Sequence, residues 1–295
     1  MSVKSQGLLE KFVPVLLLAT IVLAFLVGVL WQKVSNLESK NVAGTQTGSN
    51  TKVAGSQDQE GGGNVTIEQI KDLFSKDLIK FGDAKKKVLF VEISDPSCPF
   101  CHIASGKNSE LNKQVDESYK KRWQESFPDK KAEENKEQWQ RFTLVADGGT
   151  YVSPVEEMRK LIESGKAGYV YIYQNGHGAG EVAQKALYCA YDMGKFWQVH
   201  DLLMTSAGYD FINNTVKNDK TKSQELANFL KSAIDSDKLK KCLDSGKYDE
   251  RLTSDMALAA SLGVRGTPGF FVNATNFAGA YSWDQMKPIV DEALK

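Results

Sequence analysis

The order of apolar and polar positions divides the chain into four parts. After a tail of residues 1–11, residues 12–31 form an apolar run without charge, long enough to cross a bilayer as one helix. Residues 32–64 are rich in Gly, Ser, Thr, Asn and Gln, which predicts a flexible linker. From residue 65 to residue 295 the apolar positions recur at helix and strand spacing, which predicts the folded domain.

This folded domain is predicted to combine a few strands with many helices. Thr66 and Gln69 have the spacing of a capping box, and apolar residues follow at helical spacing as far as Leu78. Strands are predicted over residues 88–94, 169–173, 270–272 and 277–281, and further helices over residues 99–112, 154–164, 181–192, 195–205, 223–232, 235–243, 254–262 and 282–294. This order predicts an α/β fold with helical insertions at about 107–165 and 180–250.

Composition and charge narrow the class of protein. A chain of 295 residues with 41% hydrophobic content can bury one core of domain size. The net charge is zero and the basic residues alternate with acids, so the sequence gives no sign of a nucleic-acid partner. Residues 107–141 hold 17 charged residues of 35, interrupted by Trp123, Phe127 and Trp139. We interpret this segment as a solvated helical insertion; the alternative is a surface that docks a partner.

The stretch Cys98-Pro99-Phe100-Cys101-His102 carries the strongest chemical signal, because a Cys-x-x-Cys after an apolar strand is typical of redox sites. A cysteine at a helix start faces unpaired backbone N–H groups, which favour the thiolate. Cys98 is therefore the candidate nucleophile. Cys101, roughly one turn into the helix, is placed to resolve a mixed disulfide, and Pro99 suits the first helical position.

Three other interpretations of the cysteine pair remain open at this point. The same five residues match c-type haem attachment, with His102 on the iron, although haem needs neither the preceding strand nor a proline after the first cysteine. A zinc site would want four ligands, while Cys189 and Cys242 lack paired spacing. A purely structural disulfide across so short a loop would remove little chain entropy.

Several motifs together resemble the DsbA-like thiol-disulfide oxidoreductases. The resemblance covers residues 65–295 and rests on the cysteine motif, on Gly266-Thr267-Pro268, and on Cys189-Ala190 followed by Phe196-Trp197-x-x-His200-Asp201. It implies a thioredoxin fold with a helical insertion. It also implies a cis peptide bond at Thr267-Pro268 opposite the cysteine pair, with the Thr267 backbone free to bind an extended substrate segment.

The resemblance also assigns roles to two residues near the pair. Glu92 matches the buried carboxylate of thioredoxin-like proteins, which implies a proton acceptor for Cys101; the alternative is an outward-facing strand residue. The dipeptide Pro99-Phe100 tunes the redox potential. Strongly oxidising members have a histidine where this chain has Phe100, so we predict a potential between roughly −270 and −120 mV. His102 either compensates partly for that lost cation or is an exposed helix residue.

The other cysteines and histidines receive simpler interpretations. Cys189 and Cys242 are the remaining even pair, and unpaired thiols are a hazard in an oxidising compartment, so we predict a structural disulfide between them. The alternative is two separate buried thiols. His177 lies in a glycine-flanked loop, and His200 is predicted to be a packed core histidine; neither is assigned a role in the site.

The apolar run at residues 12–31 is interpreted as an uncleaved anchor. It is longer than the core of a signal peptide and lacks a clear cleavage site before Gln32, although a cleaved signal peptide is the alternative. The flanking lysines barely decide its orientation. A lasting disulfide role suits the oxidising side of a membrane, so we expect the folded domain on the extracytoplasmic side.

The sequence as a whole predicts an extracytoplasmic thiol-disulfide oxidoreductase that forms disulfides in exported proteins. The resemblance implies no cofactor beyond the Cys98–Cys101 disulfide, no metal, a monomer, and reoxidation by a quinone-linked membrane partner. Phe100 leaves a reductase or isomerase open. A membrane-tethered module that binds copper through the two thiolates is an alternative from another class.

Overall fold

The computed structural model describes residues 65–295. The predicted tail, anchor and linker at residues 1–11, 12–31 and 32–64 lie outside the described residues. Within residues 65–295, no helix has both the length and the apolar character needed to cross a membrane.

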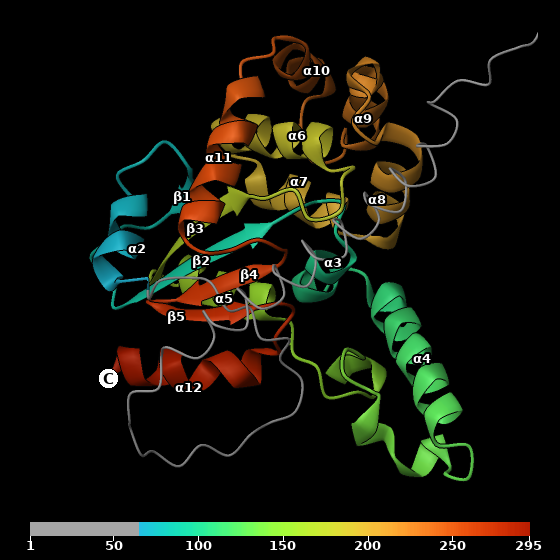
Figure 1. Cartoon of the computed structure of the whole chain (residues 1–295). Coiled ribbons are helices and arrows are strands. Elements are labelled where there is room, and N and C mark those ends of the chain that lie inside the picture. The colour runs from blue at the N-terminus through green and yellow to red at the C-terminus, as the bar shows by residue number, and fades with distance from the viewer. Residues whose placement is uncertain (1–64) are drawn as a thin grey trace, which may run out of the picture. The chain divides into compact units, whose positions relative to one another are not determined.

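A five-stranded sheet forms the centre of the fold (Figure 1). Its strands are β1 (Ile79–Phe81), β2 (Val88–Ser94), β3 (Ala167–Tyr173), β4 (Gly269–Val272) and β5 (Thr275–Ala278), in the order β1-β3-β2-β4-β5. The central pair, β2 and β3, is parallel, and the other pairings are antiparallel. Every residue of β2 and β3 is buried, as expected of parallel strands covered on both faces.

Side chains alternate along β2 between two apolar layers. Leu89, Val91 and Ile93 belong to the core under α2 (Ile67–Leu73) and α11 (Asp249–Ser261). Val88 and Phe90 belong to the larger core on the opposite face, which is covered by α3 (Pro99–Ser105), α5 (Pro154–Glu163), α6 (Glu181–Asp192), α7 (Phe196–Leu203) and α12 (Trp283–Leu294).

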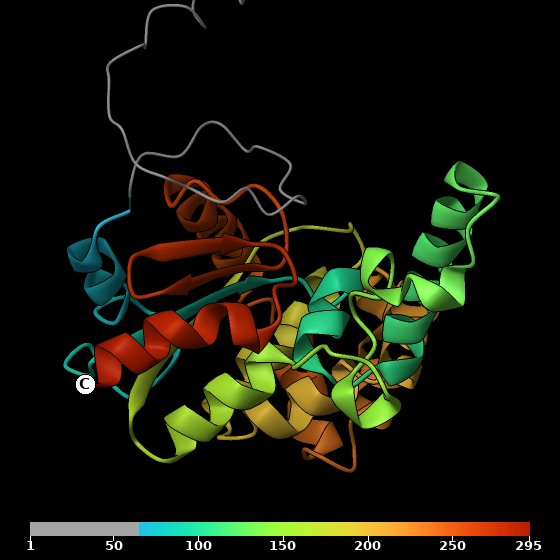
Figure 2. The same ribbon diagram turned by 90° about the horizontal axis from the view of Figure 1, so that it is seen from below.

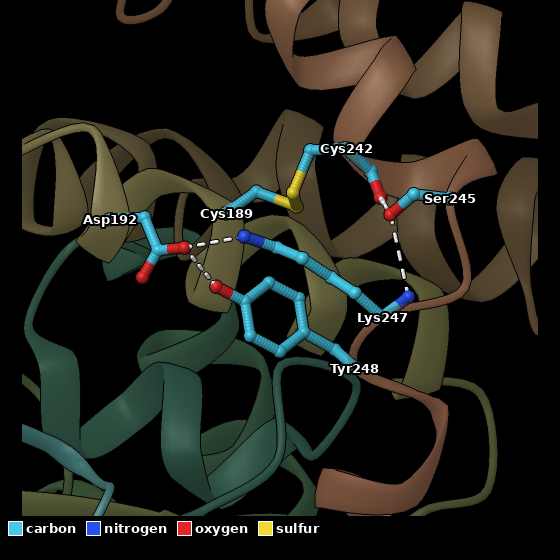
Figure 3. Close-up of a disulfide and its surroundings, with 6 residues drawn as sticks. All are labelled: Cys189, Asp192, Cys242, Ser245, Lys247 and Tyr248. Atoms are coloured by element: carbon cyan, nitrogen blue, oxygen red, sulfur yellow. Dashed lines mark hydrogen bonds and ion pairs between the residues drawn. A yellow bond between two sulfur atoms is a disulfide. The ribbon is translucent and has the colours of Figure 1, made fainter.

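The helices between β3 and β4 form a helical subdomain, as the apolar spacing predicted. After α6 and α7 come α8 (Ser206–Asp210), the π-helical turn η4 (Phe211–Val216), the short turn η5 (Lys220–Lys222), α9 (Ser223–Phe229) and α10 (Ser236–Asp244). The predicted disulfide between Cys189 on α6 and Cys242 on α10 is present (Figure 3). Beside it, Asp192 accepts hydrogen bonds from Lys247 and Tyr248.

Two predictions near the first half of the domain are wrong. The helix after Thr66 has its capping box but ends at Leu73, and Leu78 lies in the loop before β1, a strand too short to show an alternating pattern. The helix after Pro99 does not continue to Asn112. It ends at Gly106, whose left-handed backbone (φ 73°) stops the helical hydrogen-bond pattern.

A second helix, α4 (Ser109–Ser126), begins after this break. Asn108 caps it by accepting a hydrogen bond from the Leu111 N–H. Figures 1 and 2 show α4 projecting away from the sheet. The chain returns to α5 through the turns η1 (Ala132–Glu134), η2 (Lys136–Gln138) and η3 (Val145–Asp147). The charged segment is thus a mostly solvated insertion, as predicted.

We expect the Cys189→Ala/Cys242→Ala variant to lose about 4 kcal/mol of unfolding free energy under non-reducing conditions, because the bridge closes a loop with a sequence separation of 53. Urea unfolding of oxidised protein measures this loss. Reduction should destabilise the parent by a similar amount but leave the variant almost unchanged. A loss below about 1 kcal/mol would contradict the chain-entropy argument.

Candidate active site

The cysteine pair lies where β2 ends and α3 begins. Cys98 is the N-cap of α3 with an extended backbone, and Pro99 occupies the first turn, as predicted. Cys101 is one turn further along the helix. Both side chains are free thiols and both are largely buried, with relative exposures of 4% for Cys98 and 1% for Cys101.

The two thiols differ in acidity because their surroundings differ. A hydrogen bond from Cys101 lowers the pKa of Cys98 to about 7; Thr267 and the backbone N–H groups of Cys101 and Phe100 add to this effect, while burial opposes it. Burial raises the pKa of Cys101 well above its usual value, and the neighbouring Cys98 raises it further. Cys98 is therefore the sulfur that ionises near neutral pH, as the helix start predicted.

Thr267 and Pro268 lie opposite the pair, and a cis peptide bond joins them, as the resemblance implied. The Cys98 thiol donates to the Thr267 carbonyl over 3.4 Å. The hydroxyl of Thr267 is buried without a hydrogen-bond partner among the described residues. The loop before β4 thus contacts the nucleophile directly.

The sequence reasoning missed Asp95, which joins the pair to a second loop. Its carboxylate accepts hydrogen bonds from the Ser97 N–H and hydroxyl, each at 2.8 Å, and from the N–H groups of Gly176 and His177 at 2.8 and 2.9 Å. Its own N–H reaches the Cys101 sulfur at 3.5 Å. The sequence does place Asp95 directly after a buried strand and just before the cysteine motif, and this position could have identified it as a site residue.

The loop before α6 packs too closely against the site for side chains at two of its glycines. A Cβ on Gly176 would lie 1.8 Å from the Thr267 hydroxyl oxygen, and one on Gly180 would lie 1.9 Å from an Asp95 carboxylate oxygen. His177 contributes only its backbone N–H to these contacts. The glycine-rich composition of this loop is the sequence signal that could have identified it.

Glu92 is buried, with 1% exposure, so the outward-facing alternative is wrong. It alternates with Val91 and Ile93, which places it on the α3 side of the sheet. The Tyr169 hydroxyl donates to its carboxylate at 2.7 Å. Burial raises the pKa of Glu92, and His200 and Tyr169 oppose that rise. The Glu92 carboxylate thus accepts a hydrogen bond from a tyrosine and is not hydrogen-bonded to either motif cysteine.

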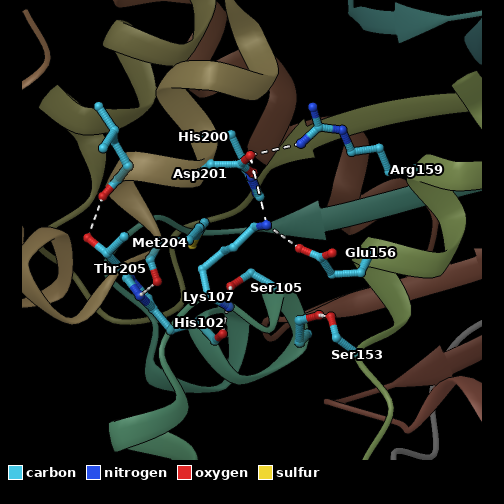
Figure 4. A network of polar contacts seen from close by, with 12 residues as sticks. His102, Ser105, Lys107, Ser153, Glu156, Arg159, His200, Asp201, Met204 and Thr205 are labelled. Atoms are coloured by element: carbon cyan, nitrogen blue, oxygen red, sulfur yellow. Dashed lines mark hydrogen bonds and ion pairs between the residues drawn. The ribbon is translucent and has the colours of Figure 1, made fainter. Parts of the chain in front are cut away.

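His102 and His200 are both buried. His102 faces two carbonyl oxygens: its Nδ1 lies 3.0 Å from that of Met204 (Figure 4), and its Nε2 lies 2.8 Å from that of Pro96. The exposed-helix alternative for this residue is therefore wrong. Burial lowers the pKa of His102 to about 4, so it carries no charge at neutral pH to replace a cation at Phe100. His200 packs against Phe196 and Trp197, which confirms it as a core histidine.

Phe100, between the cysteines, is half-buried and lies edge-on to Phe142, with ring centroids 5.7 Å apart. Tyr209 closes another side of the site: its ring lies 4.9 Å from that of His102. Within residues 65–295 there is no group of three or more His, Cys, Asp or Glu side chains placed to hold a metal ion.

Comparisons with known proteins agree on the fold. A family model described as Thioredoxin matches residues 150–292, which include Thr267 and Pro268 but not the cysteine pair. BdbD from Bacillus subtilis is 18% identical and has a TM-score of 0.47; the match covers 74% of this chain and 92% of that one. A variant of alpha-DsbA1 from Wolbachia pipientis is 16% identical, with a TM-score of 0.50 and coverages of 78% and 96%. At 16% identity, the Wolbachia structure supports a shared thioredoxin-like fold and nothing finer.

Two curated relatives match over a shorter region. The Na(+)/H(+) antiporters NhaA 1 of Salinispora arenicola and NhaA 3 of Salinispora tropica are 28% and 26% identical over 119 residues, 40% of this chain. The aligned part is 17% of each relative, so the chain spans about a sixth of their length. A match of this extent is no ground for assigning transport to this chain.

We expect Gly176→Ala to raise the pKa of Cys98 above about 7, because the added methyl group must displace Thr267, one of the groups that lower that pKa. The pH dependence of alkylation of the reduced protein by iodoacetamide measures it. Gly266→Ala is the matched control, since a Cβ there would meet no atom within 4 Å. Equal alkylation profiles for the two variants would contradict the proposed contact.

We expect Glu92→Gln to stabilise the protein at neutral pH. Burial raises the folded-state pKa of Glu92 above its ordinary value of 4.5, so the parent loses stability as the pH rises from about 4.5 through that raised pKa. The difference between variant and parent should grow by about 1.4 kcal/mol for each pH unit within that window. Urea unfolding from pH 4 to pH 8 measures it. A difference independent of pH would show that Glu92 ionises normally.

Proposed function

We propose that the chain is a DsbA-like thiol-disulfide oxidoreductase that forms disulfides in exported proteins; the thioredoxin family model over residues 150–292 and the thioredoxin-like fold support this. The observation that carries the proposal is that the pKa of Cys98 is lowered whereas the pKa of Cys101 is raised. A pair in which Cys98 ionises near pH 7 while Cys101 stays protonated suits thiol-disulfide exchange, because the mixed disulfide then forms at Cys98.

The reaction starts from the oxidised pair. A substrate thiolate attacks the Cys98 sulfur; a substrate–Cys98 disulfide forms, the Cys98–Cys101 disulfide breaks, and Cys101 leaves as a thiolate that takes up a proton. A second substrate thiolate then attacks the substrate sulfur of the mixed disulfide, and Cys98 leaves. The substrate gains one disulfide, and the protein ends with two reduced cysteines. The low pKa of Cys98 makes it a good leaving group in this second step.

Two further residues have proposed roles in this exchange. The Thr267 backbone, already in contact with Cys98, would bind an extended substrate segment across the pair. Glu92 would exchange a proton with Cys101 through the polar groups beneath the pair. Its burial and raised pKa support a group that holds a proton to a higher pH than an ordinary carboxyl group.

The direction of net exchange depends on how strongly the thiolate is stabilised. Phe100 supplies no charge, and the buried His102 is neutral at pH 7, so the Cys98 thiolate relies on hydrogen bonds alone. This supports an oxidant weaker than the members with a histidine between the cysteines. A reductase or isomerase is the second candidate for the same reason.

The location and partners are proposed on other grounds. The Cys189–Cys242 disulfide supports an oxidising compartment. We propose that residues 12–31 anchor the protein with its folded domain on the extracytoplasmic side, as a monomer. A quinone-linked membrane protein would reoxidise the cysteine pair, and no cofactor besides that pair is required.

We expect the Cys98–Cys101 reduction potential to lie between roughly −270 and −120 mV, and Phe100→His to make it more oxidising because a cation would stabilise the Cys98 thiolate. Equilibration with a series of glutathione buffers measures both values. Phe100→Leu is the neutral control. A potential near −270 mV or below would favour the reductase, and an unchanged potential in Phe100→His would contradict the electrostatic argument.

A further inference from the structure

Residues 107–153, here called the arm, leave the active-site helix at Gly106 and return beside it. Figures 1 and 2 show α4 and the turns after it extending away from the sheet. Polar contacts hold the base of the arm: the Ser153 hydroxyl donates to the Ala104 carbonyl at 2.5 Å, and Lys107 pairs with Glu156 (Figure 4). Any surface that the arm presents near its base is therefore held against the cysteine motif.

The returning segment of the arm, residues 141–143, is fixed by one buried carboxylate. Asp116, with 1% exposure, accepts hydrogen bonds from the N–H groups of Arg141, Phe142 and Thr143 at 2.6 to 3.0 Å, and from the Thr143 hydroxyl at 2.7 Å. Asn112 donates to the Phe142 carbonyl at 2.7 Å. Hydrogen bonds to a charged acceptor are stronger than neutral ones, so the backbone at Phe142 is held in one place.

Phe142 connects the arm to the cysteine motif. Its ring lies 5.7 Å from Phe100, 6.0 Å from Tyr119 on α4 and 5.7 Å from Tyr151. Phe100, Phe142 and Tyr119 are each partly exposed, whereas Tyr151 is buried beneath them. A continuous aromatic surface thus runs from the residue between the cysteines to the first helix of the arm.

Two arginines border this surface. The guanidinium groups of Arg122 and Arg141 lie 4.6 and 5.6 Å from the centre of the Tyr119 ring. Neither forms an ion pair within residues 65–295. Besides Lys107, four lysines of the arm do have acidic partners, while Lys121 and Lys130 have none within residues 65–295: Lys113 pairs with Asp147, Lys120 with Glu133, Lys131 with Glu134 and Lys136 with Glu133. Positive charge without a partner is therefore left beside the aromatic surface.

We propose that Phe100, Phe142 and Tyr119, with Arg122 and Arg141, form a docking surface for unfolded substrate segments that carry an aromatic side chain and acidic residues close to the reacting cysteine. The inference rests on the proposed function, because it names the substrate class of that site. Aromatic rings pack well on such a surface, and guanidinium groups bind carboxylates with paired hydrogen bonds. Charge complementarity selects the acidic segment over a basic one.

Asp116 is a positioning residue in this arrangement. It touches no substrate, but it places Phe142 between the cysteine motif and α4. Recognition then takes place on residues that neither supply nor accept the exchanged electrons. The acidity of Cys98 and the choice of substrate can therefore be tested separately.

The test uses the full chain in a non-ionic detergent, with its cysteine pair oxidised. Its reaction is followed by rapid quenching and mass spectrometry with reduced single-cysteine peptides of equal length. One peptide carries a phenylalanine and glutamates beside its cysteine, a second has lysines in place of the glutamates, and a third has alanine in place of the phenylalanine. Uncharged 2-mercaptoethanol reports the reactivity of the Cys98 sulfur in every variant.

Flanking charges also change the reactivity of the peptide thiol, so the readout is the ratio of the acidic to the basic peptide, compared between protein variants. We expect Arg122→Glu/Arg141→Glu to lower this ratio by on the order of tenfold at low ionic strength, with the effect largely lost in 1 M salt. Lys85→Glu/Lys86→Glu makes the same charge change in the loop before β2, at the opposite end of that strand from the cysteine motif. It should alter the ratio by less than about twofold.

The aromatic contact has its own variant. Phe142→Ala should lower the rate of the phenylalanine peptide relative to the alanine peptide by roughly threefold. If both peptides and 2-mercaptoethanol react but the charge reversal leaves the acidic-to-basic ratio unchanged, the docking surface is wrong and the proposed function stands. If no thiol reacts with the oxidised pair, the proposed function is wrong, and the docking surface, which depends on that function, is wrong too.

Discussion

Asp95 is the residue on which the geometry of the cysteine pair depends. Its carboxylate accepts hydrogen bonds from the N–H and hydroxyl of Ser97 and from two N–H groups of the loop before α6, while its own N–H reaches the Cys101 sulfur. Four donors offset the cost of burying one carboxylate. The loop held in this way brings Gly176 against Thr267, whose carbonyl contacts the nucleophile. One buried side chain thus positions three segments that are distant in the sequence.

The sequence predicted the features that depend on neighbouring residues, and it missed the contacts between residues far apart in the chain. Helices α6 and α12 and the position of Cys98 at the start of α3 depend on neighbouring residues, and the structure confirms them. The helix break at Gly106 and the three-residue strand β1 depend on where the chain must turn in the fold, and periodicity does not record that. The role of Asp95 was missed because its loop partners lie 81 and 82 residues away.

The surroundings of the two motif cysteines shift their pKa values in opposite directions. Cys98 stands at a helix start among hydrogen-bond donors, whereas Cys101 is enclosed by the core. Positive charge contributes nothing to this difference, because Phe100 is apolar and burial keeps His102 neutral. Hydrogen bonds are short-range, so the acidity of Cys98 depends on the placement of its hydrogen-bond partners, Cys101 first, more than on ionic strength.

A buried carboxylate accepts hydrogen bonds from backbone N–H groups at two places around the motif. Asp95 binds the N–H groups of the loop before α6, and Asp116 binds those of the returning segment of the arm. The first carboxylate fixes the loop that packs against Thr267; the second fixes Phe142, whose ring packs against Phe100, Tyr119 and Tyr151. Phe100 belongs both to the redox site and to the docking surface, because its backbone N–H lowers the pKa of Cys98 and its ring packs against Phe142. A substitution there therefore changes redox potential and docking together, whereas changes at Arg122 or Arg141 leave the sulfur environment untouched.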